Sequence, residues 1–199
     1  MEHTRIRIGD FTYYSGLDHL AGASEDETVA WFRKRFEKVV ARPLREVRSL
    51  GRDNEAIWDL NLCVVTIICC AIEALGSFYQ PNARDSVAFS HFVRAFMDPK
   101  HRERAAADGR TYAKILYGQF RCGLAHGFSI EGHEVATRPD EYIVEDHGSV
   151  SIDLWTLFED LERAFDRYLA RVDSHKRVRQ KFLERFDELF VDPYPQTEA

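Results

Sequence analysis

Residues 53–79 constrain the fold of this chain more than any other segment of its sequence. Between residues 60 and 75 almost every position is apolar, and only Asn61 and Glu73 interrupt the run with strongly polar side chains. A helix that is apolar on every side is expected at the centre of a helical bundle. The apolar run is shorter than the roughly 18 residues that a membrane-spanning helix needs. We therefore expect a core helix and no membrane segment.

Helical periodicity recurs on both sides of this segment. The sequence predicts five further helices, one beginning after Ser24 and the others spanning about residues 83–97, 111–126, 154–172 and 175–190. Ser24 and Glu27 form a capping box, and Asp153 and Ser174 are expected to cap the last two helices. Pro43 is expected to kink or end the first helix, because proline removes a backbone donor.

A small β structure is expected before the last two helices. Alternating residues at 129–135, 142–145 and 149–152 predict two or three short strands, with a turn at His147-Gly148. The predicted fold class is therefore all-α, a helical bundle of five to six helices with a small β-hairpin insertion. Residues 1–23 are expected to form an irregular lead-in, in which residues 5–8 alternate like a short edge strand. The bundle domain covers residues 24–190, and residues 191–199 are expected to be a disordered tail.

The charge and the start of the chain argue against some functions. A formal net charge of −6 disfavours binding of duplex nucleic acid over the whole surface, because the phosphate backbone is itself negative. A local basic groove remains compatible with it. Lys100, Arg102, Arg104 and Arg110 either form a solvated face or guide a phosphate backbone. Residues 1–7 lack the apolar core of a signal peptide, so we expect a cytoplasmic protein.

The cysteines and most histidines show no metal-binding pattern. Cys63, Cys69, Cys70 and Cys122 lack the spacings of zinc sites, so we expect buried, reduced thiols and neither a metal nor another cofactor. Seven histidines fall in expected loops or on polar faces and are given no role: His3, His19, His91, His101, His133, His147 and His175.

The eighth histidine, His126, lies in residues 116–128, a stretch of apolar and small residues that also contains Arg121. On an α-helix, five positions correspond to a rotation of roughly 140° and a rise of about 7.5 Å. The two side chains then leave the helix on different faces, yet both reach one anionic group beyond the helix end or a groove shared with a second copy. Gly127 is expected to end this helix as a C′ residue. His126 would lie in the last turn, where the helix macrodipole favours a protonated imidazole.

Residues 120–127, which read Phe-Arg-Cys-Gly-Leu-Ala-His-Gly, resemble the Arg-x4-His signature of the HEPN superfamily. Residues 72–77, Ile-Glu-Ala-Leu-Gly-Ser, are similar to what that family places opposite the signature. The resemblance implies a small helical bundle and a metal-independent endoribonuclease of a toxin–antitoxin or defence system. It also implies a homodimer whose two motifs face each other across a twofold axis, with an antitoxin or regulatory protein as a further partner.

Metal-free RNA cleavage needs a base, an acid and a cation that stabilises the phosphorane. Arg121 suits the last role because its planar fork gives paired hydrogen bonds to phosphate, and His126 suits proton transfer because histidine ordinarily titrates near neutrality. One such pair lacks a second proton-transfer group, which the resemblance supplies from the second protomer. Glu73, a carboxylate on an apolar helix, is expected to pair with Arg121. Tyr117 and Ser77 are expected to line the same cleft.

Three functions stay open. The nucleases of the HEPN family usually carry a polar residue, most often asparagine, directly after the arginine, whereas this chain has Cys122 at that substrate-facing position. Beside the nuclease, the alternative is therefore a catalytically inactive HEPN-like module that binds RNA or a protein. The third is a helical scaffold in which Arg121 and His126 are structural. The Glu73–Arg121 pair is either a positioning device or a bridge that simply joins two helices.

Overall fold

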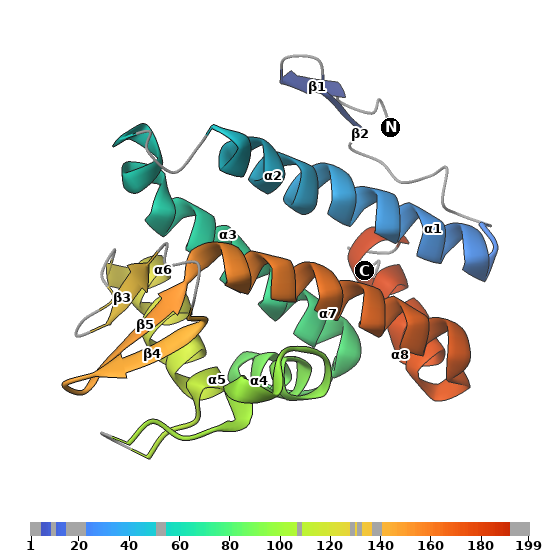
Figure 1. Ribbon diagram of the computed structural model, residues 1–199. Coiled ribbons are helices and arrows are strands. Elements are labelled where there is room, and N and C mark those ends of the chain that lie inside the picture. The colour runs from blue at the N-terminus through green and yellow to red at the C-terminus, as the bar shows by residue number, and fades with distance from the viewer. Residues whose placement is uncertain are drawn as a thin grey trace, which may run out of the picture.

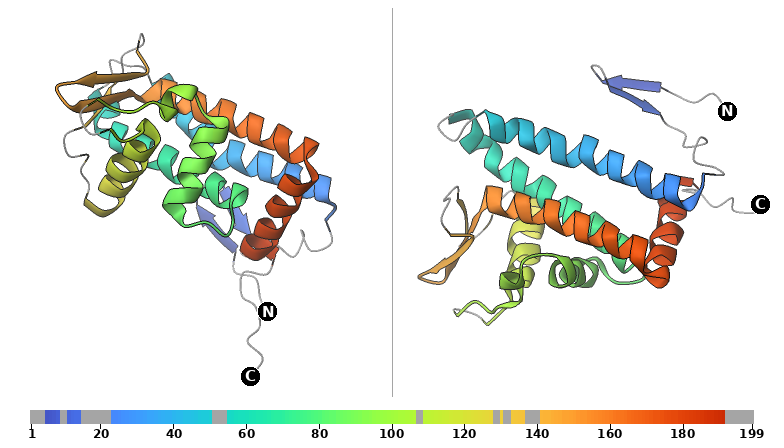
Figure 2. Two further views of the ribbon diagram at one scale, coloured as in Figure 1. Left: turned by 90° about the horizontal axis from the view of Figure 1, so that it is seen from below. Right: turned by 45° about the vertical axis from the view of Figure 1, so that its right-hand side comes forward.

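The computed structural model describes residues 5–8, 11–14, 23–50, 55–106, 109–127, 130, 133–136 and 141–191. Within them six helical segments form a bundle, and a small three-stranded sheet precedes the last two segments (Figure 1). The predicted fold class is confirmed. The sheet lies at one end of the bundle and the last helix at the other (Figure 2). The segments are α1 (Glu25–Phe36) with η2 (Glu37–Ala41) and α2 (Arg42–Ser49), α3 (Glu55–Tyr79), α4 (Asp85–Phe96), α5 (Tyr112–Ile115) with η4 (Leu116–Cys122) and α6 (Gly123–Gly127), α7 (Leu154–Ser174), and α8 (Lys176–Phe186) with η5 (Asp187–Val191).

The first helix begins at the predicted capping box and continues past Pro43. The Ser24 hydroxyl accepts a hydrogen bond from the Glu27 amide at 3.3 Å, and the Glu27 carboxylate accepts one from the Ser24 amide at 2.8 Å. Pro43 lies in the first turn of α2, directly after the π-helical turns of η2. A proline is tolerated there because its missing amide donor disturbs the start of a new run least. Pro43 is expected from the sequence to kink or end the first helix. The helix continues past Pro43, so the second of these expectations is wrong.

Helix α3 occupies the core with only part of its surface. Ile68, Ile72 and Leu75 are almost completely buried, and α3 packs on α4, α7, α8 and η4. On the other side of the helix Leu62 and Ile67 remain 41% and 43% exposed. Helix α3 is therefore a core helix, as expected, but the rest of the bundle covers only about half of its apolar stretch.

The apolar part of α3 is also longer than the sequence analysis allowed. Among the described residues, Leu60–Tyr79 is the one helical stretch whose length and composition would suffice to cross a membrane. Half of it is buried inside the bundle, as in the core helix of a soluble protein. The length of this stretch therefore does not distinguish a membrane-spanning helix from a core helix. The burial of half of it favours a core helix.

Helices α3 and α4 approach each other to backbone contact at Gly76. A Cβ atom added there would lie 2.8 Å from the carbonyl carbon and oxygen of Ala88, and 3.0 Å from the amide nitrogen of Phe89. The absence of a side chain at this position is what permits the close approach. The buried ring of Phe89 then reaches the ring of Tyr117 in η4, with 5.2 Å between their centroids. One contact thus sets the spacing of three helical segments.

The insertion is a sheet with the strand order β3-β5-β4. Strands β4 (Ile143–Asp146) and β5 (Ser149–Asp153) are antiparallel and are joined by His147 and Gly148. Both linking residues have positive φ angles, 47° and 84°, as in a two-residue hairpin turn. The predicted hairpin is therefore confirmed. The short strand β3 (Glu134–Ala136) pairs with β5 in parallel, an arrangement that alternation alone does not predict.

Some expected helix ends differ. Asp153 caps α7 as expected, since its carboxylate accepts a hydrogen bond from the Thr156 amide at 2.7 Å. Ser174 does not cap α8, because its hydroxyl donates to the Ala170 carbonyl of the preceding turn. Gly127 lies inside α6 without a positive φ angle, so it is not the expected C′ glycine.

The two ends of the chain are described only in part. Strands β1 (Arg5–Ile8) and β2 (Phe11–Tyr14) form an antiparallel pair, which confirms the predicted strand at residues 5–8. The expected irregular lead-in is wrong at residues 11–14, which form β2. Its other residues up to residue 22 lie outside the described residues. The expected disordered tail does so from residue 192 onward.

Gly76→Ala is expected to destabilise the protein by about 1–3 kcal/mol, because the methyl group must push the backbones of α3 and α4 apart. The higher helix propensity of alanine, worth about 0.5–1 kcal/mol, offsets only part of this cost. Gly118→Ala in η4 is the matched control, since a Cβ atom there meets nothing within 4 Å. Urea unfolding followed by circular dichroism measures both variants. A Gly76→Ala protein as stable as the control would contradict the close approach.

Candidate functional site

The motif segment, residues 112–127, packs directly on α3, as the sequence predicts. Thr111 caps it by accepting a hydrogen bond from the Lys114 amide at 3.4 Å. The segment starts as α5, widens into the π-helical turns of η4, which carry Arg121, and closes as α6, which carries His126. Wider turns of this kind inside α-helices are frequent at functional sites. The sequence analysis assumed a regular α-helix and missed these turns.

Arg121 and Glu73 form a two-pronged ion pair between η4 and α3. Arg121 Nε donates to Glu73 Oε2 at 2.5 Å, and Arg121 Nη2 donates to Glu73 Oε1 at 2.9 Å. The two side chains are 21% and 17% exposed, so most of the pair is removed from water. The hydrogen bonds to Glu73 raise the pKa of Arg121 above its usual value, against the opposing effect of burial. The predicted pairing is confirmed, and it fixes the orientation of the guanidinium.

The ion pair occupies one edge of the guanidinium and leaves the donors of the other edge unused by Glu73. Arginine has five N–H donors, of which Glu73 takes one on Nε and one on Nη2. Arg121 Nη1 lies 3.5 Å from Nε2 of the exposed His126. The guanidinium carbon lies 5.9 Å from the centre of the Tyr117 ring, within the range of a cation–π contact. Arg121 and His126 therefore lie close enough to contact one group, as the sequence analysis expects.

The other three residues expected in the site are Tyr117, Cys122 and Ser77. Tyr117 lies near Cys122, and Cys122 is partly exposed. Burial is the main cause that raises the pKa of Tyr117, and the nearby Cys122 and Glu73 add to it. Ser77 uses its hydroxyl to donate to the Ala74 carbonyl of its own helix at 2.8 Å. Ser77 is thus on the same helix as Glu73, but its hydrogen bond goes to the backbone.

The expectation of four buried thiols is wrong. Cys69 is completely buried, and burial strongly raises its pKa. Cys63 and Cys70 are exposed on the side of α3 that the bundle leaves uncovered. Burial of part of the side chain raises the pKa of the Cys70 thiol, which also experiences the charges of Arg121 and Glu73. Cys70 therefore lies close to the motif.

The basic residues that precede the motif are partly engaged with their own segment. Lys100 pairs with Glu103 at 3.6 Å, next to the short 3-10 turn η3 (Pro99–Arg102). Arg104 donates to the Gly109 carbonyl at 2.6 Å. These contacts favour the solvated-face interpretation of the two residues over a role as phosphate guides.

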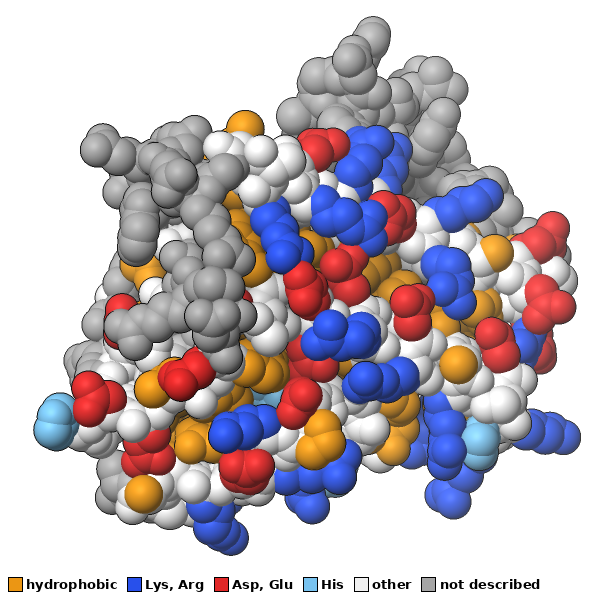
Figure 3. Space-filling view, viewed as in Figure 1, with side chains coloured by type: hydrophobic (Ala, Val, Ile, Leu, Met, Phe, Trp, Pro, Cys, Tyr) orange, Lys and Arg blue, Asp and Glu red, His pale blue; other side chains and the backbone are white. Residues whose placement is uncertain are grey.

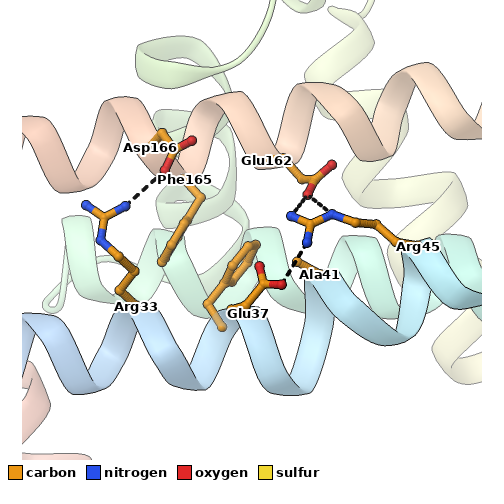
Figure 4. A pocket seen from close by; sticks show the side chains of 8 residues that line it. Arg33, Glu37, Ala41, Arg45, Glu162, Phe165 and Asp166 are labelled. Carbon is orange, nitrogen blue, oxygen red and sulfur yellow. Dashed lines mark hydrogen bonds and ion pairs between the residues drawn. The ribbon is translucent and has the colours of Figure 1, made fainter.

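A hollow of about 290 Å³ lies between α1–α2 and α7, and none of its lining residues belongs to the motif segment (Figure 4). Phe36 and Phe165 stack within it, with ring centroids 3.8 Å apart. Ion pairs cross between the helices around these rings, on a face where basic and acidic side chains alternate (Figure 3). The pairs that cross are Arg33 with Asp166 and Arg45 with Glu162, and Arg45 also pairs with Glu37 of its own segment. Every charged residue of the hollow is paired, so we interpret it as a structural junction.

A buried polar cluster joins η3, α7 and Tyr142, the residue directly before β4. His101 and Asp160 are 0% and 1% exposed, and His101 Nε2 lies 2.6 Å from the Tyr142 hydroxyl. Asp160 Oδ2 accepts hydrogen bonds from the Tyr142 hydroxyl at 3.1 Å and from the Asp98 amide at 2.9 Å. Burial by itself raises the pKa of Asp160, but hydrogen bonds from His101, the Asp98 amide and Tyr142 outweigh it and hold the pKa below its usual value.

The sequence analysis missed this cluster. It placed His101 in an exposed connection, whereas the side chain is completely buried. One signal was available, because Asp160 lies four and eight residues before the buried Ala164 and Tyr168 and therefore shares their face of α7. No comparable pattern identifies His101.

The chain matches no protein-family model, no curated protein and no solved structure. Its function must therefore be inferred from the geometry of its own residues. Within the described part of the chain, no group of three His, Cys, Asp or Glu side chains is arranged to hold a metal ion. The charged residues of the hollow are paired with one another, and the cluster around His101 and Asp160 is buried. In the motif, Arg121 has donors that Glu73 does not use and lies beside the exposed His126, so the motif is the candidate site.

A double-mutant cycle on Glu73→Ala and Arg121→Ala is expected to give a coupling energy of about 1–2 kcal/mol in urea unfolding. Hydrogen bonds between charged groups that are largely removed from water have this order of strength. Arg33 and Asp166 provide the control pair, because their side chains are 50% and 72% exposed and should couple by less than about 1 kcal/mol. Equal coupling of the two pairs would contradict the tight positioning of Arg121.

Asp160→Asn is expected to cost about 1–3 kcal/mol at pH 7, because it removes charged hydrogen bonds from a buried cluster. The lowered pKa means that the native state favours the ionised carboxylate. The stabilisation is therefore present above the unfolded pKa of about 3.9 and is lost as the pH falls through the lower native pKa. Urea unfolding should show a difference between wild type and variant that shrinks below about pH 4. The exposed Asp166→Asn is the control, and a constant difference for Asp160→Asn would contradict the assignment.

Proposed function

We propose that the chain is a HEPN-like, metal-independent endoribonuclease of a toxin–antitoxin or defence system. The observation that carries the proposal is the guanidinium of Arg121, which Glu73 holds by one edge while the other edge lies beside His126. The substrate is RNA, because the reaction such a pair serves begins at a 2′-hydroxyl group, which DNA lacks.

In this proposal each residue has a distinct task. The open Nη1 and Nη2 donors of Arg121 bind the scissile phosphate and stabilise the charge that builds up on its oxygens. His126 takes the proton of the 2′-hydroxyl or gives a proton to the leaving 5′-oxygen. Glu73 positions Arg121 without touching the substrate. Tyr117 supports the guanidinium from its ring face, a contact that the 5.9 Å separation permits.

One histidine does not supply both a base and an acid in a single step. The proposal therefore includes a homodimer whose two motifs share a groove, so that one His126 acts as the base and the other as the acid. An uncontrolled ribonuclease would damage its own cell, which is why we include an antitoxin or regulatory protein as a partner. The proposed location is the cytoplasm, where the RNA substrates are.

A second candidate is a HEPN-like module that binds RNA or a protein without cleaving. The observation in its favour is Cys122, a partly exposed thiol in the position where the family's nucleases usually carry asparagine. A neutral thiol is a weak donor, whereas an amide donates strongly. The missing donor would weaken stabilisation of the transition state by ~2.7–4 kcal/mol.

Purified protein is expected to cleave mixed single-stranded RNA in EDTA. His126→Ala should slow cleavage by about 10²–10⁴-fold, since it removes the proton-transfer group, and Arg121→Ala should abolish it. Lys114→Ala is the matched control, because Lys114 is an exposed cation of the same segment that does not contact the Arg121–Glu73 pair. Denaturing gels of end-labelled RNA measure the rates.

Cys122→Asn distinguishes a slow nuclease from a binding module. A nuclease should keep or increase its activity, because the amide restores a donor beside the phosphate. A folded Cys122→Asn protein that leaves RNA intact over many hours, at high concentration, would exclude the nuclease. RNA binding that requires Arg121 would then support the binding module.

A further inference from the structure

One side of α3 is both apolar and exposed. Leu60, Leu62 and Ile67 keep 37%, 41% and 43% of their surface in solvent, and Cys63 and Cys70 are exposed as well. With 3.6 residues per turn, the uncovered positions fall within one half of the helix circumference. We call this half the α3 face; it consists of Leu60, Leu62, Cys63, Thr66, Ile67, Cys70, Glu73, Ala74 and Ser77.

The chemistry of the α3 face selects another apolar helix as its partner. Its only charged residue is Glu73, which Arg121 already neutralises. A strongly charged partner would lose hydration here without finding a counterion. The residues at 60, 63, 67, 70 and 74 also follow the alternating three- and four-residue spacing of helices that pair along a seam. A second copy of the chain offers a matching surface with the same spacing.

The extent of the face agrees with the centre of a protein interface. From residue 60 to residue 77 the face is about 26 Å long, and a helix is about 10 Å wide. The resulting footprint of about 260 Å² is roughly a third of the ~800 Å² that each partner buries in a standard interface. The remaining area must come from the flanks. On the Glu73 side the flank is the motif segment, whose residues Ala125, His126 and Gly127 are exposed.

Two α3 faces related by a twofold axis bring both motif segments together in one orientation only. The motif segment lies along the Glu73 edge of the face. In a parallel pair of α3 helices, the two motif segments end on opposite sides of the pair. In an antiparallel pair the two motif segments lie on the same side of the pair. Their separation along the helices is twice the distance, measured along α3, from the twofold axis to Glu73. Cys70 lies in the middle of the exposed arc and only about 4.5 Å along the helix from Glu73.

We propose that two copies of the chain associate through their α3 faces in antiparallel orientation, with the twofold axis beside Cys70. The two Glu73 levels are then about 9 Å apart, and the two Arg121–His126 pairs open into one groove. In this register Cys70 faces the partner subunit's Cys70, and Ile67 packs on the partner subunit's Ala74, a large side chain against a small one. The proposal deepens the proposed function by giving the shared groove a defined interface, but the interface rests on the α3 face itself.

The natural cysteines test this register in the intact chain. Diamide accepts two protons and two electrons from a pair of thiols, which then form one disulfide. A short bismaleimide links thiols that are somewhat too far apart for this bond. We expect a covalent dimer from wild type, Cys63→Ser and Cys122→Ser, and its loss from Cys70→Ser. The yield should not change when the protein is diluted tenfold within the concentration range in which it is dimeric.

Other patterns would overturn the proposed arrangement. A twofold axis at Ile67 would join Cys63 to the partner subunit's Cys70, so either serine variant would prevent cross-linking. A parallel pair would still cross-link in either single variant. Loss of the cross-link in Cys122→Ser would place the contact at the motif instead. A monomeric mass at micromolar concentrations would exclude the self-association, including the case of a monomer that binds lipid vesicles through α3.

A charge substitution tests the interface without cross-linking. Ile67→Glu is expected to weaken the dimer on the order of 100-fold in sedimentation equilibrium, because it buries an unpaired carboxylate. Val87→Glu on α4 is the matched control, since Val87 is 41% exposed and lies outside the α3 face. Equal dimer affinity of the two variants would overturn the interface. A Cys70-dependent dimer that does not cleave RNA would support this interface while refuting the nuclease, whereas RNA cleavage by a monomer would refute the interface.

Discussion

The contact of α3 with α4 at Gly76 is the constraint on which the rest of the bundle depends. The carbonyl group of Ala88 occupies the space in which any other residue at position 76 would place its Cβ atom. This close approach puts Phe89 against Tyr117 and thereby fixes the motif segment relative to α3. Glu73 lies about one turn before Gly76 on α3. The position of Glu73 relative to Arg121 therefore depends on the contact between α3 and α4 at Gly76. The ion pair of the site is a consequence of helix packing rather than a separate feature.

The parts of the fold that could be predicted from the sequence are those governed by local chemistry. Ser24 and Glu27 bond within one turn of each other, and Asp153 bonds the amide three residues ahead, so their caps required no tertiary information. The His147-Gly148 turn likewise depends on two adjacent residues that tolerate positive φ angles. Errors arose where packing decides. The exposure of Ile67 depends on which helices surround α3, and large apolar side chains occur on both the covered and the uncovered side of this helix.

The same distinction applies to the candidate site. The pairing of Glu73 with Arg121 was predictable, because an isolated carboxylate and an isolated guanidinium on two apolar segments each need a partner. The common reach of Arg121 and His126 was also expected, but the π-helical turns of η4 that carry Arg121 were not, because they have no recognised signal in residues 116–122. The burial of His101 was equally hidden, since its partners Tyr142 and Asp160 come from elements distant in sequence. When a site combines residues from several helices or strands, the sequence predicts it only where an isolated charged group needs a partner.

The distribution of charge over the bundle connects the proposed site with the proposed interface. On the surface formed by α1–α2 and α7, basic and acidic side chains are joined in pairs such as Arg33 with Asp166 and Arg48 with Glu159 (Figure 3). Covering that surface with a second copy would remove hydrated ion pairs from water with little gain. The α3 face has apolar side chains in place of such pairs, so association is favourable there. Because the Arg121–Glu73 pair borders the α3 face, the surface best suited to hold two copies together is also the surface that brings their motifs into reach of each other.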